Sequence, residues 1–319
     1  MGSATRIVRM ALHAFFSNYH PAASAAALLA LPFSAAALVS RSPALLAQRP
    51  VILPALSRRL RRVLVAAGFP PASQLLFLLN HRLSQSIFSF LATLPFSLSF
   101  LLLAKAYVVR ATQARGRGRG RSAAPAASGP LRLRGCYPAM ATTQLANFAA
   151  LLFAHAAVFA ALLAAFSGAE ALRLGSEGRA MLALSAAGVI VYSVALANAT
   201  AVCNLATVVA AAEGRSGCHA VLKAVLLVRG DAATAVAVAL PASLATAAVE
   251  GLFQIRITRP YMLNGKMSSA MVCEGFLIAY IHSMICVLDT VITCMVYQTC
   301  KASHSCDLLE LEEKGDFAA

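Results

Sequence analysis

Long apolar stretches, separated by short polar or basic segments, follow one another along this chain. Six of them are long enough to cross the hydrocarbon core of a bilayer as helices, which needs about 18 or more mainly apolar residues. The pattern therefore predicts an all-α fold, a polytopic transmembrane helix bundle of about six spans with interfacial amphipathic helices. The expected spans cover residues 21–40, 83–109, 139–166, 180–212, 232–250 and 269–299.

The segments between the spans include candidates for interfacial helices. Residues 1–20 alternate Arg6, Arg9 and His13 with apolar residues, as a helix lying in the membrane interface does, and residues 218–230 have the same character. Residues 63–80 are apolar but contain two adjacent prolines, which favours one or two interfacial helices rather than a span. Six spans then place both termini on one side of the membrane, which we take as the cytosol because the basic segment 110–138 then lies there with the C-terminal tail. If 63–80 crosses instead, the chain has seven spans and both basic loops lie on one side.

These segments define one transmembrane domain over residues 21–300, preceded by the interfacial lead 1–20. Its two basic loops are expected at 41–82 and 110–138, and the second carries a short Arg-Gly repeat typical of disorder. Residues 301–319 form an acidic tail that is also expected to be disordered.

Composition supports a membrane protein and changes the meaning of the charge. The chain is 60% hydrophobic and only 12% charged, whereas soluble domains are about 25% charged. The net charge is +15, and in a membrane protein such an excess belongs to loops that contact anionic headgroups. We therefore expect the lipid bilayer and membrane proteins as partners, no nucleic acid, and a location in the secretory pathway or plasma membrane.

The last apolar stretch carries three ionisable residues, Glu274, His282 and Asp289. Steps of eight and seven residues place them within about 80° of one helix face, and such groups should face protein or water rather than lipid. About 10–12 Å of helix separates neighbours, so no two of them share a metal ion unaided. They form either a polar clasp between helices or a path for protons or ions. The candidate partners on other spans are His155, Asn198, Asn204 and Lys105.

Three prolines inside expected spans, Pro32, Pro95 and Pro241, are candidate kinks. Each removes a backbone donor and leaves the carbonyl four residues earlier without its helical partner. One reading is an ordinary membrane-helix kink, and the other is a set of hinges or exposed carbonyls that line a cavity.

No signature of catalysis or metal binding appears in the sequence. The eight cysteines contain no C-x-x-C pair, and H-E-x-x-H, G-x-S-x-G and P-loop patterns are absent. We therefore expect no catalytic residues, no metal, no cofactor and no enzymatic activity.

Several short motifs resemble a group of uncharacterised plant multi-span membrane proteins. The resemblance rests on Phe15–His20, Leu31–Ser34, Ala66–Pro70, Leu83–Gln85, Leu94–Ser97, Cys203–Ala206, Glu213–Gly214 and the residues Tyr280, His282 and Asp289. It implies about six spans and no catalytic assignment. More loosely, the stretch from Glu213 to Gly230 is similar to part of the membrane domain attached to some bacterial glycerophosphodiester phosphodiesterases.

Two functions follow from the sequence. The first is a non-enzymatic integral membrane protein that acts through helix packing and protein or lipid partners. The second is a small-solute or proton-coupled transporter-like protein that uses the acidic face of the sixth span.

Overall fold

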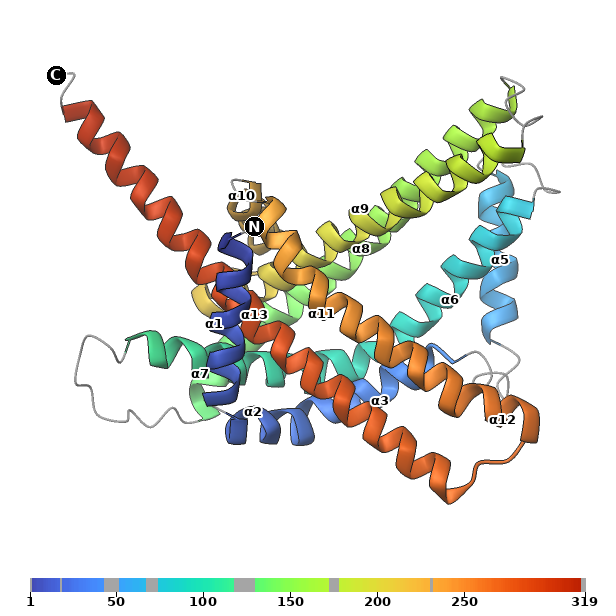
Figure 1. Cartoon of the computed structure of the whole chain (residues 1–319), viewed down its shortest axis with the longest axis horizontal. Coiled ribbons are helices and arrows are strands. Elements are labelled where there is room, and N and C mark those ends of the chain that lie inside the picture. Colours follow the sequence, from blue (N-terminus) through green and yellow to red (C-terminus); the bar gives the residue numbers. More distant parts are fainter. Residues whose placement is uncertain are drawn as a thin grey trace.

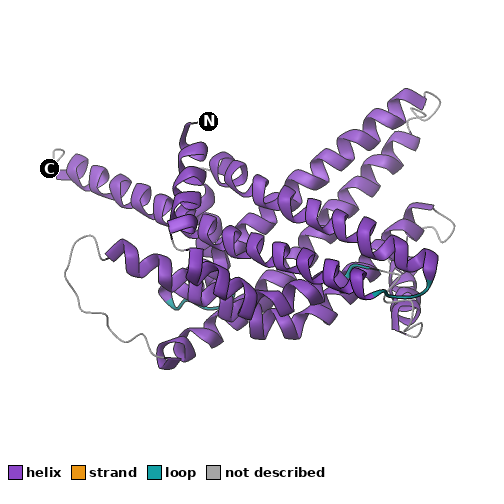
Figure 2. Ribbon diagram, turned by 60° about the horizontal axis from the view of Figure 1, so that its bottom comes forward, coloured by secondary structure: helices purple, strands orange, loops and turns teal. Residues whose placement is uncertain are grey.

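The computed structural model describes residues 2–17, 19–42, 52–66, 74–117, 130–171, 178–229 and 232–316. Within these ranges every regular element is a helix, and no strand is present (Figure 2). The prediction of an all-α helical bundle is therefore confirmed.

The elements follow the alternation of apolar and polar stretches. The first part of the chain forms α1 (Gly2–Ser17), α2 (Tyr19–Ala25), the π-helix η1 (Ala26–Ala30), α3 (Leu31–Ser40), α5 (Ile52–Ala66), α6 (Gln74–Phe96), the π-helix η2 (Ser97–Leu101) and α7 (Leu102–Arg117). The second part forms α8 (Pro130–Ala171), α9 (Gly178–Glu213), α10 (Cys218–Arg229), α11 (Ala232–Phe253), the π-helix η4 (Gln254–Thr258), α12 (Arg259–Asn264) and α13 (Ser269–Asp316).

Six helical stretches in the described residues are long and apolar enough to cross a membrane. Each overlaps one of the six expected spans, and together they identify the chain as a membrane protein. The stretches are Ala22–Ser40, Ser84–Gln113, Cys136–Leu162, Ala186–Glu213, Ala233–Asn264 and Ser269–Ala302.

Helix α13 lies at the centre of the bundle, where it contacts α1, α3, α7, α9, α10 and α11. Figure 1 shows it running antiparallel to α11, to which it is connected through α12 and the turn at Gly265. Helices α8 and α9 pair as a hairpin that projects to the upper right of the same view. The ionisable residues of α13 are therefore close to helices from both halves of the chain.

Alanine occupies the tightest helix contacts. Small side chains let backbones approach closely in a bundle where lipid offers little hydrophobic driving force for helix association. The alanines with no exposed surface are Ala11, Ala26, Ala30, Ala206, Ala210, Ala220 and Ala224.

The N-terminal helix packs on the bundle, whereas the sequence suggested a helix lying free in the interface. In α1, Ile7, Ala11 and Phe15 are spaced four residues apart and are almost fully buried in the core shared with α13. The basic residues Arg6 and Arg9 point to the exposed face. The amphipathic pattern was thus correctly located, but protein rather than lipid covers much of its apolar face.

The expected basic loop 41–82 contains more helix than predicted. Helix α5 ends at Ala66, and α6 begins at Gln74, so residues 74–80 extend the helix of the second span. Asn80 Nδ2 donates a 2.7 Å hydrogen bond to Ser57 Oγ and thereby joins the two helices. The prolines that suggested an interfacial break lie at 70 and 71, outside the described residues.

The chain also differs from the disorder expected at 301–319, because α13 continues to Asp316. Leucine, glutamate and lysine dominate 308–314; they are strong helix formers, and extending an existing helix needs no new nucleus. In the expected loop 110–138, α7 reaches Arg117 and α8 begins at Pro130. The rest of the Arg-Gly segment, 118–129, lies outside the described residues.

Two of the three candidate kink prolines adjoin π-helical turns. Pro32 follows η1, and Pro95 precedes η2. In η1 the amide of Leu31 bonds the carbonyl of Ala26, five residues earlier, which is the widened turn of a π-helix. Such a turn redirects backbone hydrogen bonds beside a residue that has no N–H to donate.

The third candidate, Pro241, lies within α11, which continues through it as an α-helix. A π-helical turn, η4, instead precedes Pro260 at the start of α12. Pro260 was not singled out from the sequence because it falls after the expected end of the fifth span at 250. The helix in fact continues well beyond that point.

Candidate functional site

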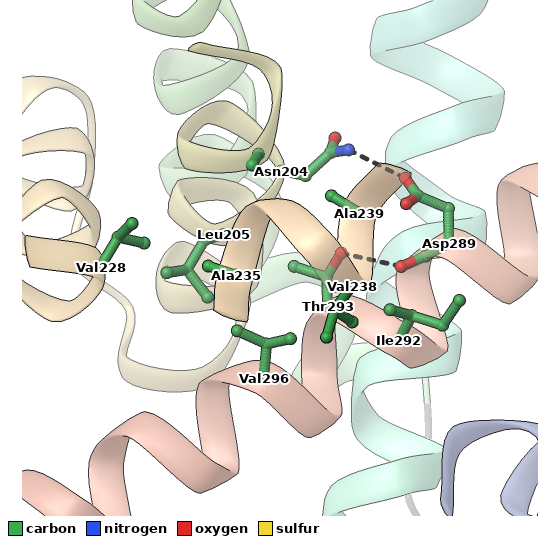
Figure 3. A pocket seen from close by; sticks show the side chains of 11 residues that line it. Asn204, Leu205, Val228, Ala235, Val238, Ala239, Asp289, Ile292, Thr293 and Val296 are labelled. Atoms are coloured by element: carbon green, nitrogen blue, oxygen red, sulfur yellow. Dashed lines mark hydrogen bonds between the residues drawn. The ribbon is translucent and has the colours of Figure 1, made fainter. Parts of the chain in front are cut away.

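Asp289 ends a hydrogen-bonded chain that joins three helices. Lys105 Nζ of α7 donates to Asn204 Oδ1 of α9 at 3.1 Å, and Asn204 Nδ2 donates to Asp289 Oδ2 of α13 at 2.8 Å. Figure 3 shows the Asn204 amide directed at the carboxylate. Two of the four expected partners therefore lie with the acid of the sixth span.

Small residues leave room for the hydrogen-bonded side chains of Lys105, Asn204 and Asp289. Ala201 of α9 and Ala239 of α11 lie beside Asn204 and Asp289, and Thr293 Oγ1 donates to the Asp289 backbone carbonyl at 2.7 Å. A central aspartate costs about 2.5–3.5 kcal/mol on an insertion scale, so the amide donor offsets part of a substantial penalty. The local sequence thus provides both space and a donor.

The other two ionisable residues that the sequence singled out in the sixth span have separate partners. His282 is buried, and its Nδ1 lies 3.0 Å from Ser34 Oγ of α3. Glu274 forms an ion pair with Arg256 of η4 near the exposed end of the helix. Glu274, His282 and Asp289 therefore share a helix but do not form one cluster.

The remaining expected partners lie away from Asp289. His155 Nδ1 is 2.8 Å from the hydroxyl of Tyr192, between α8 and α9. Asn198 Nδ2 donates to the carbonyl of Val194 on its own helix at 3.0 Å. Both are separate local contacts.

A cavity of about 390 Å³ opens beside the Lys105–Asn204–Asp289 chain. Its wall includes four charged side chains, those of Arg41, Lys105, Glu250 and Asp289, together with Asn204 and His282. They come from α7, α9, α11, α13 and the residue that follows α3. The volume falls within the range of about 300–1,000 Å³ that is typical of small-molecule sites.

An ion pair between Arg41 and Glu250 borders this cavity. The Arg41 side chain is 55% exposed and that of Glu250 is 23% exposed, so the pair lies at the cavity mouth. Gln254 Nε2 donates to the Arg41 carbonyl at 3.1 Å, and Ser42 hydrogen-bonds Thr258. These contacts fasten the end of α3 to α11 and η4.

A second cavity, of about 520 Å³, lies on the other side of this ion pair. It shares Phe33, Ala37, Arg41 and Glu250 with the first and extends to His155. His155 and Asp289 thus face two adjoining spaces that meet at the same pair of charges.

A third, much smaller space of about 20 Å³ lies beyond Asn204 and Asp289 (Figure 3). It is large enough for about one water molecule. Apart from those two residues and Thr293, its wall is apolar, formed by Ala201, Leu205, Val228, Ala235, Val238, Ala239, Ile292 and Val296. The Asn204–Asp289 contact therefore separates the large polar cavity from a narrow apolar end.

Glu213 is the centre of a polar cluster at this end of the bundle. Lys223 Nζ lies 2.5 Å from its carboxylate, the Tyr297 hydroxyl donates to it at 2.7 Å, and Lys301 Nζ lies 3.8 Å away. The cluster joins α9, α10 and α13. The fourth span was expected to end at 212, and Glu213 was not paired with Lys223 from the sequence, although the two glycines with positive φ, Gly214 and Gly217, are the signal for the turn that folds α10 back.

Arg41 and Glu250 were also missed, because the first was assigned to a loop and the second to the closing residue of a span. Their side chains add one positive and one negative charge to the wall of the cavity of about 390 Å³. In the described residues, no three His, Cys, Asp or Glu side chains are close enough to hold a metal ion.

Comparison with known proteins gives one result. A family model described as "Domain of unknown function (DUF8558)" matches residues 136–313, more than half of the chain. Neither the curated proteins nor the solved structures contain a match to this chain. The matched region runs from α8 into the last turns of α13 and includes Asn204, Glu213, Glu250 and Asp289, while Arg41 and Lys105 lie before it.

Proposed function

This chain belongs to the DUF8558 family, whose activity is unknown, and we propose that it is a multi-pass, non-enzymatic membrane protein that takes up a small polar solute. The observation that carries this proposal is the cavity of about 390 Å³ with Lys105 and Asp289 in its wall. It favours the transporter-like alternative, with the acidic face of the sixth span lining the solute site.

Partly buried charges beside an open space support uptake over packing alone. A polar clasp joins helices by direct contact, as where the Nδ2 of buried Asn147 donates to the Cys203 carbonyl at 2.8 Å and to Thr207 Oγ1 at 3.0 Å. Lys105 and Asp289 instead contact each other only through Asn204 and border a cavity. Ionisable residues placed in this way are typical of substrate and ion pathways.

The cavity has a natural entrance and a closed end. Arg41, more than half exposed, marks the entrance, while the Asn204–Asp289 contact and the Glu213 cluster close the other end. Passage of a solute then requires α9, α11 and α13 to separate at Asp289, and the π-helical turns η1, η2 and η4 are suitable hinges.

A second candidate function is action through helix packing and through lipid or protein partners. Helix α10 supports it, since Leu222, Val225 and Leu226 are exposed on a helix that also carries Lys223 and Arg229. The arginines of α5, Arg58–Arg62, are exposed as well. We propose that both helices contact anionic headgroups; the proposed partners are the bilayer and other membrane proteins, and nucleic acid is not among them.

The resemblance to plant multi-span proteins supports a plant origin. We further propose a site in the secretory pathway or plasma membrane, and six spans with both termini in the cytosol, because this orientation keeps the Arg-Gly loop in the cytosol with the tail. Protease cleavage at Arg119 and at Arg59 on opposite sides of the membrane is the outcome expected for six spans. Cleavage at both from the same side would contradict that orientation.

Uptake into vesicles that contain the purified full-length chain tests the proposed function. Protein-containing vesicles should take up at least one of L-alanine, propionate, propionamide and glucose faster than protein-free vesicles. Asp289→Asn should abolish that uptake, and Asn198→Ala, which removes a hydrogen bond away from the cavity, should preserve it. Folded protein that accelerates none of these solutes would favour the packing function instead.

A further inference from the structure

The described residues in the wall of the cavity of about 390 Å³ carry equal numbers of opposite charges. Arg41 and Lys105 are the cations, and Glu250 and Asp289 are the anions. A net-charged solute would upset this balance within a low-dielectric bundle, where an uncompensated charge is costly. The wall therefore favours a solute whose own charges sum to zero.

The two inner charges are held apart. Asn204 lies between them and bonds each one, whereas the outer pair, Arg41 and Glu250, is in direct contact. Among the described residues, no ion pair joins Lys105 directly to Asp289. Lys105 retains two ammonium donors and Asp289 retains one carboxylate oxygen beyond these bonds.

We propose that this inner site binds a small zwitterion that carries one ammonium and one carboxylate, as an α-amino acid does. This inference rests on the proposed function and specifies the solute class. The carboxylate of the ligand accepts hydrogen bonds from Lys105 Nζ, and its ammonium donates to the free oxygen of Asp289. Asn204 orients both residues and keeps them from forming a closed ion pair.

Other solute classes meet only half of this site. A simple carboxylate pairs with Lys105 but places a second anion beside Asp289, and a simple amine has the reverse defect. An uncharged amide leaves both charged groups without charged partners. A zwitterion gains most from the site, because it alone places an opposite charge beside both residues, and attraction between opposite charges is strong in a low-dielectric bundle.

The test is a binding measurement on the purified full-length protein with five probes. L-Alanine and L-leucine are zwitterions of different size, and isopropylamine, propionate and propionamide are the matched cation, anion and neutral amide. At least one zwitterion should bind about tenfold or more tightly than each of the three others, the factor expected from one additional charge-assisted hydrogen bond.

Variants assign the two contacts. Asp289→Asn should weaken zwitterion binding by about tenfold and leave it no tighter than binding of propionate; Lys105→Met should similarly remove the advantage over isopropylamine. The double variant of Lys105→Met with Asp289→Asn keeps the charge balance and so should fold, yet lose the preference altogether. Asn198→Ala is the control and should bind the probes as the original chain does.

Equal binding of propionamide and the zwitterions, or an unchanged ranking in the double variant, would overturn the zwitterion site. Failure to bind either zwitterion would overturn it as well. If the vesicles still take up propionamide or glucose in a manner that depends on Asp289, the proposed function survives without this solute class. If no solute enters, both proposals fail.

Discussion

Asn204 and Asp289 are 85 residues apart in the chain, yet the amide of one donates to the carboxylate of the other at 2.8 Å. The contact joins α9 to α13 and closes one end of a polar cavity. Lys105 is linked to Asp289 through Asn204, because its ammonium donates to the Asn204 amide oxygen. The stability and the proposed activity of the bundle both depend on this arrangement.

Replacing Asn204 by alanine should destabilise the protein by roughly 1–3 kcal/mol, because it leaves the Asp289 carboxylate and the Lys105 ammonium without their shared partner. Unfolding in detergent measures the change. Asn198→Ala is the matched control, since it removes a hydrogen bond within one helix, and should cost less. Equal losses in the two variants would contradict a special role for Asn204.

Lys105 and Asp289 should be energetically coupled. Removing either charge leaves the other uncompensated, whereas removing both restores balance, so Lys105→Met combined with Asp289→Asn should cost less than the sum of the single changes. Residues in one hydrogen-bond network typically show coupling of about 0.5–3 kcal/mol. A double-mutant cycle of unfolding free energies measures this coupling, and simple additivity would show that the charges act independently.

Glu213 should contribute more to stability than a surface ion pair does. Its side chain is 16% exposed and contacts Lys223 and Tyr297, so Glu213→Gln should cost about 1–3 kcal/mol in thermal unfolding. Arg215 lies 3.7 Å from the same carboxylate but is 59% exposed. Arg215→Gln should therefore change the free energy of unfolding by no more than about 1 kcal/mol. A larger loss would contradict the prediction that Lys223 and Tyr297, rather than Arg215, are the main partners of Glu213.

Cys286 should report access to the cavity. It lines the cavity of about 390 Å³, whereas Cys294 is buried in the core. In chains that keep only one cysteine, a small polar thiol reagent should modify Cys286 much faster than Cys294. Arg41→Ala removes the ion pair at the mouth and should speed the Cys286 reaction alone. Faster modification of both cysteines would indicate general loosening of the fold.

Two glycines should respond to alanine with opposite signs. Gly217 has a φ of 61° and its amide donates to Thr143 Oγ1 at 3.0 Å, so Gly217→Ala should cost about 1–2 kcal/mol. Gly251 lies within α11, and a Cβ there would meet nothing within 4 Å. Gly251→Ala should stabilise the helix by about 0.5–1 kcal/mol. Thermal unfolding of both variants tests the pair of predictions.

The sequence predicted the elements better than their contacts. Hydrophobic length located the six apolar helices, because crossing a bilayer imposes a requirement that one stretch of sequence can satisfy. The same reasoning singled out Asp289, Asn204 and Lys105 as polar residues that need partners within apolar helices. It also offered His155 and Asn198 equally, since periodicity does not specify which helix faces which.

Arg41, Glu250 and η4 were missed for the same reason, because local sequence does not specify which helices are in contact. Arg41 was assigned to a loop and Glu250 to the end of a span, where charge is common, and their separation of 209 positions in the sequence hides their contact. Helix η4 was missed because the fifth span was ended at Glu250, before Pro260. Contacts between distant segments depend on how helices pack in three dimensions, which the local pattern does not contain.

Helix α13 runs without a break from the centre of the bundle at Asp289 to its end at Asp316. With 48 residues it is about 72 Å long, more than twice the roughly 30 Å thickness of the hydrocarbon core of a bilayer. From Asp289 to its last residue, Asp316, the helix extends about 40 Å, so a tilt of about 10° at Asp289 moves the far end by about 7 Å. A tilt of this size at Asp289 would therefore displace the far end of the helix by several ångströms.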